Sequence, residues 1–118
     1  MLFRSIGGEL RRLSQTMVGP LTRLVLHELH LDKAFMGTIG FALNEGLTTT
    51  DPSEAFTKTL VMGHARQVIV LADSSKAGKV SFASAGSWGN VHVLITDKQL
   101  DKDFAKELIK KDIKLVRA

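Results

Sequence analysis

A carboxylate, two hydroxyls and an ammonium group follow one another at Asp73-Ser74-Ser75-Lys76, directly after the apolar run at residues 68–71. That run is short and mostly β-branched, which is typical of a strand buried on both faces of a parallel sheet. Ligands of open α/β sheets bind just beyond the carboxyl ends of the strands. There an aspartate can accept hydrogen bonds from sugar hydroxyls, and a lysine can bind phosphate. The residues alone leave a second interpretation open, a polar loop with a solvated Lys76.

A second aspartate, Asp97, follows the apolar run at residues 91–95. If the two runs form neighbouring strands, Asp73 and Asp97 line one edge of the sheet beside Lys76. This arrangement is the best pocket that the chemistry of the sequence offers.

The elements before this pocket begin with a candidate short strand at residues 2–6, which ends at paired glycines. Gly19-Pro20 then begins a helix, because proline suits the first helical position. The apolar stripe of this helix is Leu21, Leu24, Val25 and Leu29. Residues 32–36 form the next predicted strand. The run Gly37-Thr38-Ile39-Gly40 follows it, and both a turn and the backbone wall of a pocket are open interpretations.

The sequence Asp51-Pro52-Ser53-Glu54 predicts the start of another helix. Asp51 can cap the helix, Pro52 suits its first position, and Glu54 can complete a capping box by reaching back. The helix is expected to run to about residue 65. Its predicted inward-facing residues are Phe56, Leu60 and Ala65.

The last part of the chain repeats the pattern of strand and helix. Residues 81–89 read as a short helix or a loop, and residues 91–95 as a strand. Leu100, Phe104 and Leu108 recur every four residues and predict a helix over residues 98–111. Residues 113–116 form a last strand. Strands separated by helices in this rhythm predict an α/β fold, with a small, mostly parallel open sheet flanked by helices.

Bulk composition limits the function classes. The length of 118 residues suits one small domain or a piece of a larger one. The formal charge of +4 is scattered, which does not suit a DNA-reading basic helix. The absence of cysteine excludes disulfides and thiolate chemistry and is compatible with the cytoplasm. No apolar run approaches membrane-spanning length, so we expect no membrane partner.

Metal and cofactor signals are weak. His27 and His30 lie three residues apart, but no third ligand is spaced to join them. The chain has no P-loop, no G-x-G-x-x-G and no G-x-S-x-G motif. We therefore expect neither a metal nor a cofactor.

An ordered set of short motifs extends over nearly the whole chain. The motifs are Gly7-Gly8-x-Leu10-Arg11, Ser14, Gly19-Pro20, Asp32-Lys33-Ala34-Phe35-Met36-Gly37, Gly46-Leu47-Thr48, Glu54-Ala55, Lys58, Leu71-Ala72-Asp73-Ser74-Ser75-Lys76-x-Gly78, Ser81-Phe82 and Leu94-Ile95-Thr96-Asp97. Each motif is short, but the ordered set is specific. It resembles the effector-sensing domain of DeoR-family transcriptional regulators.

The resemblance implies that residues 1–118 are the sensor portion of a bacterial regulator, usually a repressor of carbohydrate metabolism genes. Such regulators carry an N-terminal helix-turn-helix for DNA and a sensor for a phosphorylated sugar. Neither the helix-turn-helix nor the opening of the sensor, with its Asp-x-Gly-Thr-Thr type loop, is recognisable here. We therefore expect a partial sensor domain that contacts DNA only through a helix-turn-helix outside it. Self-association through an unpaired strand edge is also expected.

Site roles follow partly from the resemblance, which links Asp73 and Lys76 to the inducer response. We expect Lys76 to bind phosphate and Asp73 to accept from sugar hydroxyls. Lys58 adds a second cation. The expected backbone wall is Gly37, Thr38 and Gly40. The weaker pocket candidates are Thr49, Thr50 and Asp97.

The alternative function is enzymatic, because the family's sensor is similar in fold to type A ribose-5-phosphate isomerase and glucosamine-6-phosphate deaminase. That isomerase has a glutamate base eighteen residues before its phosphate-binding lysine, and counting back from Lys76 reaches Lys58. An ammonium group there takes no proton unless its pKa is strongly depressed. We therefore expect binding without turnover. An isomerase or deaminase fragment is the alternative, and a bare dimerisation remnant is the third interpretation.

Overall fold

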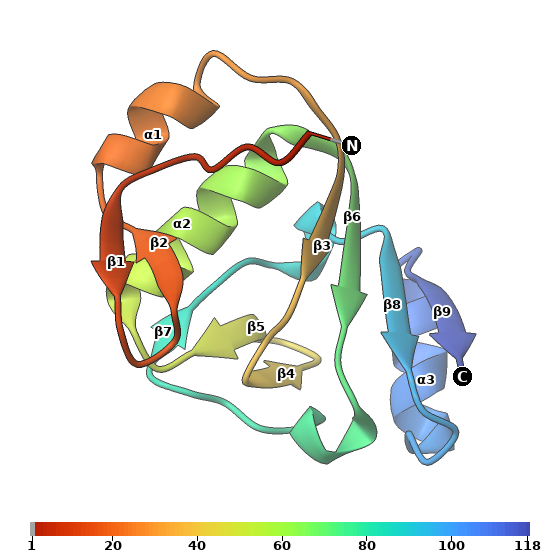
Figure 1. Ribbon diagram of the computed structural model, residues 1–118. Coiled ribbons are helices and arrows are strands. Elements are labelled where there is room, and N and C mark those ends of the chain that lie inside the picture. Colours follow the sequence, from red (N-terminus) through yellow and green to blue (C-terminus); the bar gives the residue numbers. More distant parts are fainter. Residues whose placement is uncertain (1) are drawn as a thin grey trace.

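The computed structural model describes residues 2–118 and has a four-stranded parallel sheet at its centre (Figure 1). The strand order is β3-β6-β8-β9. The strands are β3 (Leu31–Met36), β6 (Ala65–Leu71), β8 (Val93–Thr96) and β9 (Lys114–Arg117). This sheet confirms the predicted α/β class and the mostly parallel strand arrangement. Among the described residues, no helix is long and apolar enough to cross a bilayer.

Two antiparallel units accompany the parallel sheet. One is the hairpin of β1 (Glu9–Arg11) and β2 (Thr16–Val18), and the other is a three-stranded sheet of β4 (Gly40–Ala42), β5 (Gly46–Thr49) and β7 (Ala83–Ser84). The predicted strand at residues 2–6 is wrong, because pairing begins only at Glu9. The paired glycines lie before the hairpin instead of after a strand. A side chain at Gly8 would collide with the carbonyl of Val18. The positive φ of 117° at Gly8 also disfavours any residue other than glycine.

The helices are α1 (Leu21–Leu26), α2 (Pro52–Gly63) and α3 (Lys102–Lys110), with short 3-10 turns η1 (Ser74–Lys76) and η2 (Trp88–Asn90). Asp51 caps α2 as predicted, since its Oδ2 accepts the Glu54 N–H at 2.9 Å. The capping box is not completed. The carboxylate of Glu54 instead accepts the Thr16 hydroxyl at 2.9 Å and so attaches the β1–β2 hairpin to α2.

The buried residues of α2 differ from the predicted set. Ala55, Thr57 and Met62 are buried, whereas Phe56 is 43% exposed and Ala65 already belongs to β6. Small side chains let this helix approach the sheets closely, so the bulky Phe56 points away. The apolar stripe of α1 is likewise exposed. This helix is held by Thr22 and Leu26, of which Thr22 donates its hydroxyl to the Gly19 carbonyl at 2.6 Å.

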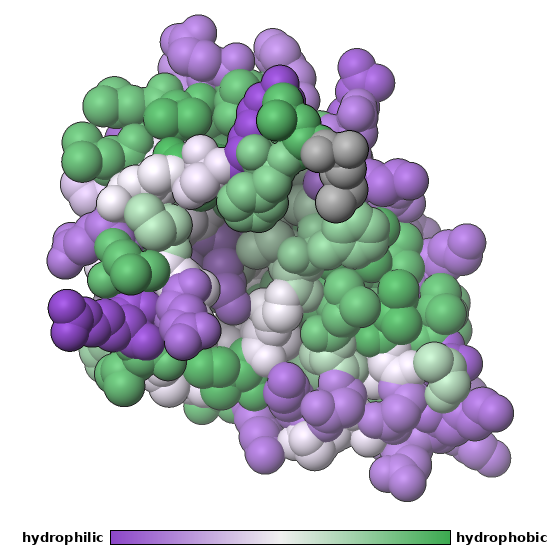
Figure 2. Space-filling view, in the orientation of Figure 1, coloured by the Kyte–Doolittle hydropathy of each residue, from purple (hydrophilic) through white to green (hydrophobic). Residues whose placement is uncertain are grey.

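The two faces of the parallel sheet differ in exposure: the face toward α2 and α3 is buried, and the opposite face is exposed at Phe35, Leu71 and Val116 but buried at Ile69 and Val93. Val68, Val70 and Leu94 point to the face that α2 and α3 cover, and none of the three is exposed. In Figure 1, α3 lies behind β8 and β9 and α2 lies to the left of β3, and apolar residues show on the opposite face in Figure 2. The strand order explains why both helices lie on one face, because each new strand of the chain is added at the same edge of the sheet. Right-handed crossovers then place their connections on the same face.

Candidate functional site

The carboxyl ends of β6 and β8 bring the two predicted aspartates to one edge. The strands pair in parallel, with Val70 opposite Leu94, so Asp73 and Asp97 both follow the same end of the sheet. Asp97 Oδ2 accepts the Ser74 N–H at 2.8 Å, and Lys76 Nζ lies 3.8 Å from Asp73 Oδ2. The expected neighbourhood of Asp73, Lys76 and Asp97 is therefore present.

Both carboxylates use donors of the turn that follows β6. Asp73 accepts the N–H and the hydroxyl of Ser75, and this hydroxyl, followed by the N–H and by Lys76, lowers the pKa of Asp73. The Ser74 N–H, followed by the Ser74 hydroxyl, lowers the pKa of Asp97. Asp97 therefore fixes the position of the turn, while Asp73 Oδ2 faces the Lys76 ammonium group.

A shallow cavity of about 360 Å³ lies at this edge. Its lining residues are Leu71, Ala72, Asp73, Lys76, Ile95, Thr96, Asp97 and Ala118. The buried hydroxyl of Thr96 has no hydrogen-bond partner among the described residues. The cavity thus combines an apolar floor with two carboxylates and one ammonium group.

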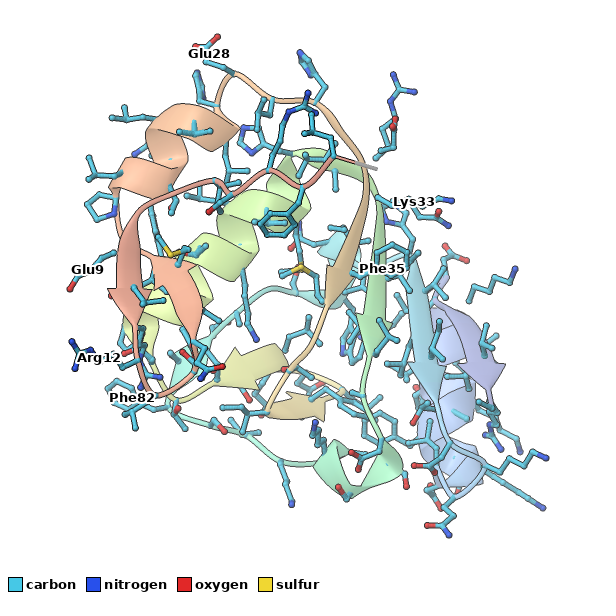
Figure 3. The ribbon with its side chains drawn as sticks, viewed as in Figure 1. Glu9, Arg12, Glu28, Lys33, Phe35 and Phe82 are labelled. Carbon is cyan, nitrogen blue, oxygen red and sulfur yellow. The ribbon has the colours of Figure 1, made fainter. Side chains whose placement is uncertain are left out.

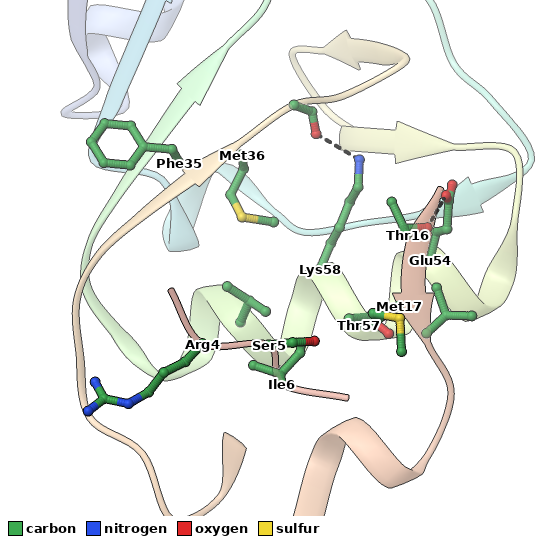
Figure 4. A pocket seen from close by; sticks show the side chains of 13 residues that line it. Arg4, Ser5, Ile6, Thr16, Met17, Phe35, Met36, Glu54, Thr57 and Lys58 are labelled. Carbon is green, nitrogen blue, oxygen red and sulfur yellow. Dashed lines mark hydrogen bonds between the residues drawn. The ribbon is translucent and has the colours of Figure 1, made fainter. Parts of the chain in front are cut away.

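The side chain of Lys58, on α2, reaches the carboxyl end of β3, which lies at the same edge of the sheet. Its Nζ donates to the Gly37 carbonyl at 2.8 Å, directly after β3 ends (Figure 4). Burial lowers the pKa of Lys58, Glu54 opposes this, and the Lys76 charge lowers the pKa further. The two lysines line different cavities, Lys58 the larger one and Lys76 the one beside Asp73.

A larger cavity of about 500 Å³ lies between α2, β2, the end of β3 and the segment before β1 (Figure 4). Its lining residues are Arg4, Ser5, Ile6, Thr16, Met17, Val18, Phe35, Met36, Gly37, Glu54, Thr57, Lys58 and Val61. Six of these side chains are apolar and six are polar or charged. Glu54 and Lys58, one turn apart on α2, supply opposite charges to its wall.

Glu54 lines this cavity, although its sequence pattern predicted only a role at the start of a helix. It is 7% exposed, and its pKa is lowered by the Ser14 hydroxyl first, and then by Thr16, Arg11 and Lys58, against the effect of burial. Arg11 NH1 lies 3.8 Å from Glu54 Oε1. The spacing of Glu54 and Lys58, which are four residues apart on a helix, was the available signal that both face one side.

Four of the predicted pocket residues line neither cavity. The Thr38 hydroxyl donates to the carbonyls of Gly40 and Thr48, at 2.8 and 3.0 Å. Gly40 has no room for a side chain because the Lys79 carbonyl packs against it. Thr49 is buried in β5, where its hydroxyl has no hydrogen-bond partner within residues 2–118, and Thr50 is exposed. Thr38, Gly40 and Thr49 belong to the packing of the small antiparallel sheet, and only Gly37 of the predicted wall lines one of the two cavities.

Two of the histidines form hydrogen bonds with backbone groups. His92 Nδ1 accepts the Val68 N–H at 2.9 Å, and His64 Nδ1 lies 2.9 Å from the Leu60 carbonyl. Within residues 2–118, no three His, Asp or Glu side chains are grouped to hold a metal ion.

Comparison with known proteins gives one family and several relatives. The family described as DeoR C terminal sensor domain matches residues 3–98. The HTH-type transcriptional regulator GlpR of Haloferax volcanii is 36% identical over 102 residues, which cover 86% of this chain and 40% of GlpR. The lactose phosphotransferase system repressor of Streptococcus mutans is 37% identical over 101 residues, with the same two coverages. The chain thus spans about two fifths of the length of these curated relatives.

Proposed function

Because this chain belongs to the DeoR C-terminal sensor domain family, we propose that it is the effector-binding portion of a transcriptional regulator that senses a phosphorylated sugar. The relatives support this, since they are named as transcriptional regulators and one is a lactose phosphotransferase system repressor. In this proposal the regulator is a repressor, acts in the cytoplasm and contacts DNA through a helix-turn-helix domain outside the sensor.

The observation that carries the proposal is the grouping of Asp73, Lys76 and Asp97 around one cavity at the carboxyl ends of β6 and β8. A phosphate dianion there binds the Lys76 ammonium group, and Lys58 adds a second positive charge from the end of β3. Asp73 then accepts from the sugar hydroxyls, and the backbone at Gly37 borders the site. Asp97 acts indirectly, by holding the turn that carries Lys76.

The test is a thermal-shift screen against a panel of phosphorylated sugars, with the variants Lys76→Ala and Lys79→Ala. Lys79 is exposed and lines neither cavity, so it controls for the loss of a positive charge. A true effector at 100 times its Kd stabilises the folded chain by about 2.7 kcal/mol. This shift is expected in the wild type and in Lys79→Ala, and not in Lys76→Ala. An equal shift in all three proteins, or none with any sugar, contradicts the proposal.

A second candidate function is sugar-phosphate isomerisation, which one observation favours. The ionised carboxylate of Glu54 lines a cavity beside Lys58, so a potential base is present although Lys58 itself is cationic. The sensor proposal predicts binding without turnover. A coupled assay would measure conversion of a bound sugar phosphate. Conversion by the wild type that is absent in Glu54→Gln would support the enzymatic function.

Self-association is also part of the proposal. β3 is an edge strand of the parallel sheet, so one side of its backbone is free to pair. Light scattering should detect an oligomer whose population falls when Asp32→Pro removes a backbone donor from the free edge of β3, since the Leu31 N–H already points to β6 and successive residues alternate. A monomer at every concentration contradicts this part.

A further inference from the structure

Lys58 is the lysine of the larger cavity, and no carboxylate is paired with it. Its Nζ donates to the Gly37 carbonyl at 2.8 Å, and it forms no ion pair within residues 2–118. Lys76, which lines the other cavity, has Asp73 Oδ2 at 3.8 Å. The remaining lysines line neither cavity. Lys58 therefore differs from the other lysines in its access to a cavity without an ion-paired partner.

The larger cavity has room for a small organic molecule and a way in for it. Its volume of about 500 Å³ lies within the usual size of ligand pockets, roughly 300–1,000 Å³. Phe35 lines the cavity, is 66% exposed and projects from β3 in Figure 3. The cavity is therefore open to solvent on the side of Phe35, whereas Val18 and Met36 on its wall are buried.

The lining of the cavity favours a ligand with a hydrocarbon body. Half of its side chains that extend beyond a Cα atom are apolar. Two of its hydroxyls are already used, since Thr16 donates to Glu54 at 2.9 Å and Thr57 donates to the Ser53 carbonyl at 3.0 Å. A polyhydroxylated ligand would leave hydroxyls without partners there, which is costly in a buried site.

The surroundings of Lys58 also favour a reactive amine. Burial is the largest effect on the pKa of Lys58 and lowers it, while the charge of Glu54 raises it by less. A neutral amine is a nucleophile toward carbonyl carbon, and lysines that are desolvated in apolar pockets are the usual ones to form imines. The hydrogen bond to the Gly37 carbonyl uses one N–H of the amine and leaves the lone pair of its nitrogen free.

We propose that Lys58 is a covalent capture site for a small aldehyde with a hydrocarbon body, which enters the larger cavity and forms an imine with the Lys58 amino group. The ammonium group first gives one proton to water, and the amine nitrogen then attacks the carbonyl carbon. The carbonyl oxygen leaves as water with the two amine hydrogens, and a C=N bond forms. No oxidant or reductant takes part. Water hydrolyses the imine when the aldehyde concentration falls, so the capture is reversible.

This capture site goes beyond the sensor proposal, because it requires no ligand at Lys76. It is also compatible with that proposal. A proton that returns to the imine nitrogen restores both the positive charge of Lys58 and a donor for the Gly37 carbonyl.

The probe is butanal with sodium cyanoborohydride, which reduces an imine to a stable secondary amine and spares the free aldehyde at neutral pH. The 118-residue chain is treated for short times, and peptide mass spectrometry measures the butyl label at each lysine. We expect Lys58 to be labelled at least about fivefold faster than the exposed Lys79. Its labelling should also begin at a lower pH than that of Lys79, because the pKa of Lys58 lies below its ordinary value of 10.5.

Two variants connect the fast labelling to the cavity. Val61→Phe fills part of the cavity about one helical turn from Lys58 and should slow the labelling of Lys58 several-fold, with no change at Lys79. A thermal melt of Val61→Phe that matches the wild type establishes that the fold is intact. Lys58→Arg should remove the fast-labelled position and leave the other lysines unchanged. In urea, where the cavity is lost, Lys58 and Lys79 should react at similar rates.

Three outcomes would overturn the capture site. They are equal labelling of Lys58 and Lys79 in the folded chain, a preference for Lys58 that persists in urea, and fast labelling that a folded Val61→Phe leaves unchanged. Glyceraldehyde, a polar aldehyde of similar size, should show a smaller preference for Lys58 than butanal, and an equal preference contradicts the hydrocarbon body. None of these results depends on sugar-phosphate binding at Lys76, which the thermal-shift screen measures separately.

Discussion

The two faces of the parallel sheet are made from alternate residues of the same strands and differ in exposure. Val68, Val70 and Leu94 are completely buried, whereas on the other face Leu71 and Val116 are more than a third exposed and only the central Ile69 and Val93 are buried. Both sets are aliphatic, so hydropathy does not distinguish them. The difference comes from the direction of winding, which places α2 and α3 on the inner face. Burial in this fold is therefore decided by topology as much as by residue type.

The largest expected effect comes from removing an inner-face side chain. Leu94→Ala should lower the free energy of unfolding by about 2–5 kcal/mol, because it leaves a cavity in a closely packed core. The neighbouring Leu71→Ala, on the opposite face, should cost less than about 1 kcal/mol. Urea unfolding followed by circular dichroism measures both variants. Equal losses would remove the distinction between the two faces.

A smaller effect is expected from Glu54, which attaches the hairpin to α2 on the covered side. Glu54→Gln should cost about 1–2 kcal/mol at neutral pH, because it weakens the hydrogen bond from Thr16 and leaves Arg11 without one of its two carboxylates. The exposed Glu28→Gln is the matched control.

The pH dependence of that contribution has a definite sign. The pKa of Glu54 in the folded chain lies below its ordinary value of 4.5, so the folded state favours the ionised form. Its stabilisation is present above the unfolded pKa and is lost as the pH falls through the folded pKa. Wild-type stability should therefore fall toward that of Glu54→Gln as the pH drops below about 4.5, when the two are compared by urea titration. A constant difference at all pH values contradicts this assignment.

The smallest effect is expected at the most exposed position of the opposite face. Phe35→Lys should change the free energy of unfolding by no more than about 0.5 kcal/mol, since Phe35 is mostly exposed. Met36→Lys, the adjacent inward residue, should cost several times more, because it buries an unpaired charge. Thermal melts of the two variants separate the faces at a single strand. A large loss in Phe35→Lys would mean that this face is already packed around Phe35.

Local signals predicted the elements that depend on local chemistry. Asp51 and Pro52 located the start of α2, because capping requires only a few adjacent residues. The polar turn after β6 was also predicted from its own residues. The β1–β2 hairpin was missed, since it depends on Thr16 reaching Glu54, which lies 38 residues away. The predicted wall residues Thr38 and Gly40 pack elsewhere, because the β4–β5 hairpin turns them toward its own carbonyls and Lys79.

The sequence by itself determined the order of the four parallel strands and of α2 and α3, the parallel class of the main sheet and the presence of Asp73, Lys76 and Asp97 at one edge. Those features follow from periodicity, capping and the length of the connections. Only the tertiary structure decided which face of the sheet is covered, that Glu54 shares a cavity wall with Lys58, and that the Lys58 ammonium group binds the Gly37 carbonyl. Periodicity identifies the residues that share a face, but the packing of distant segments decides what that face meets.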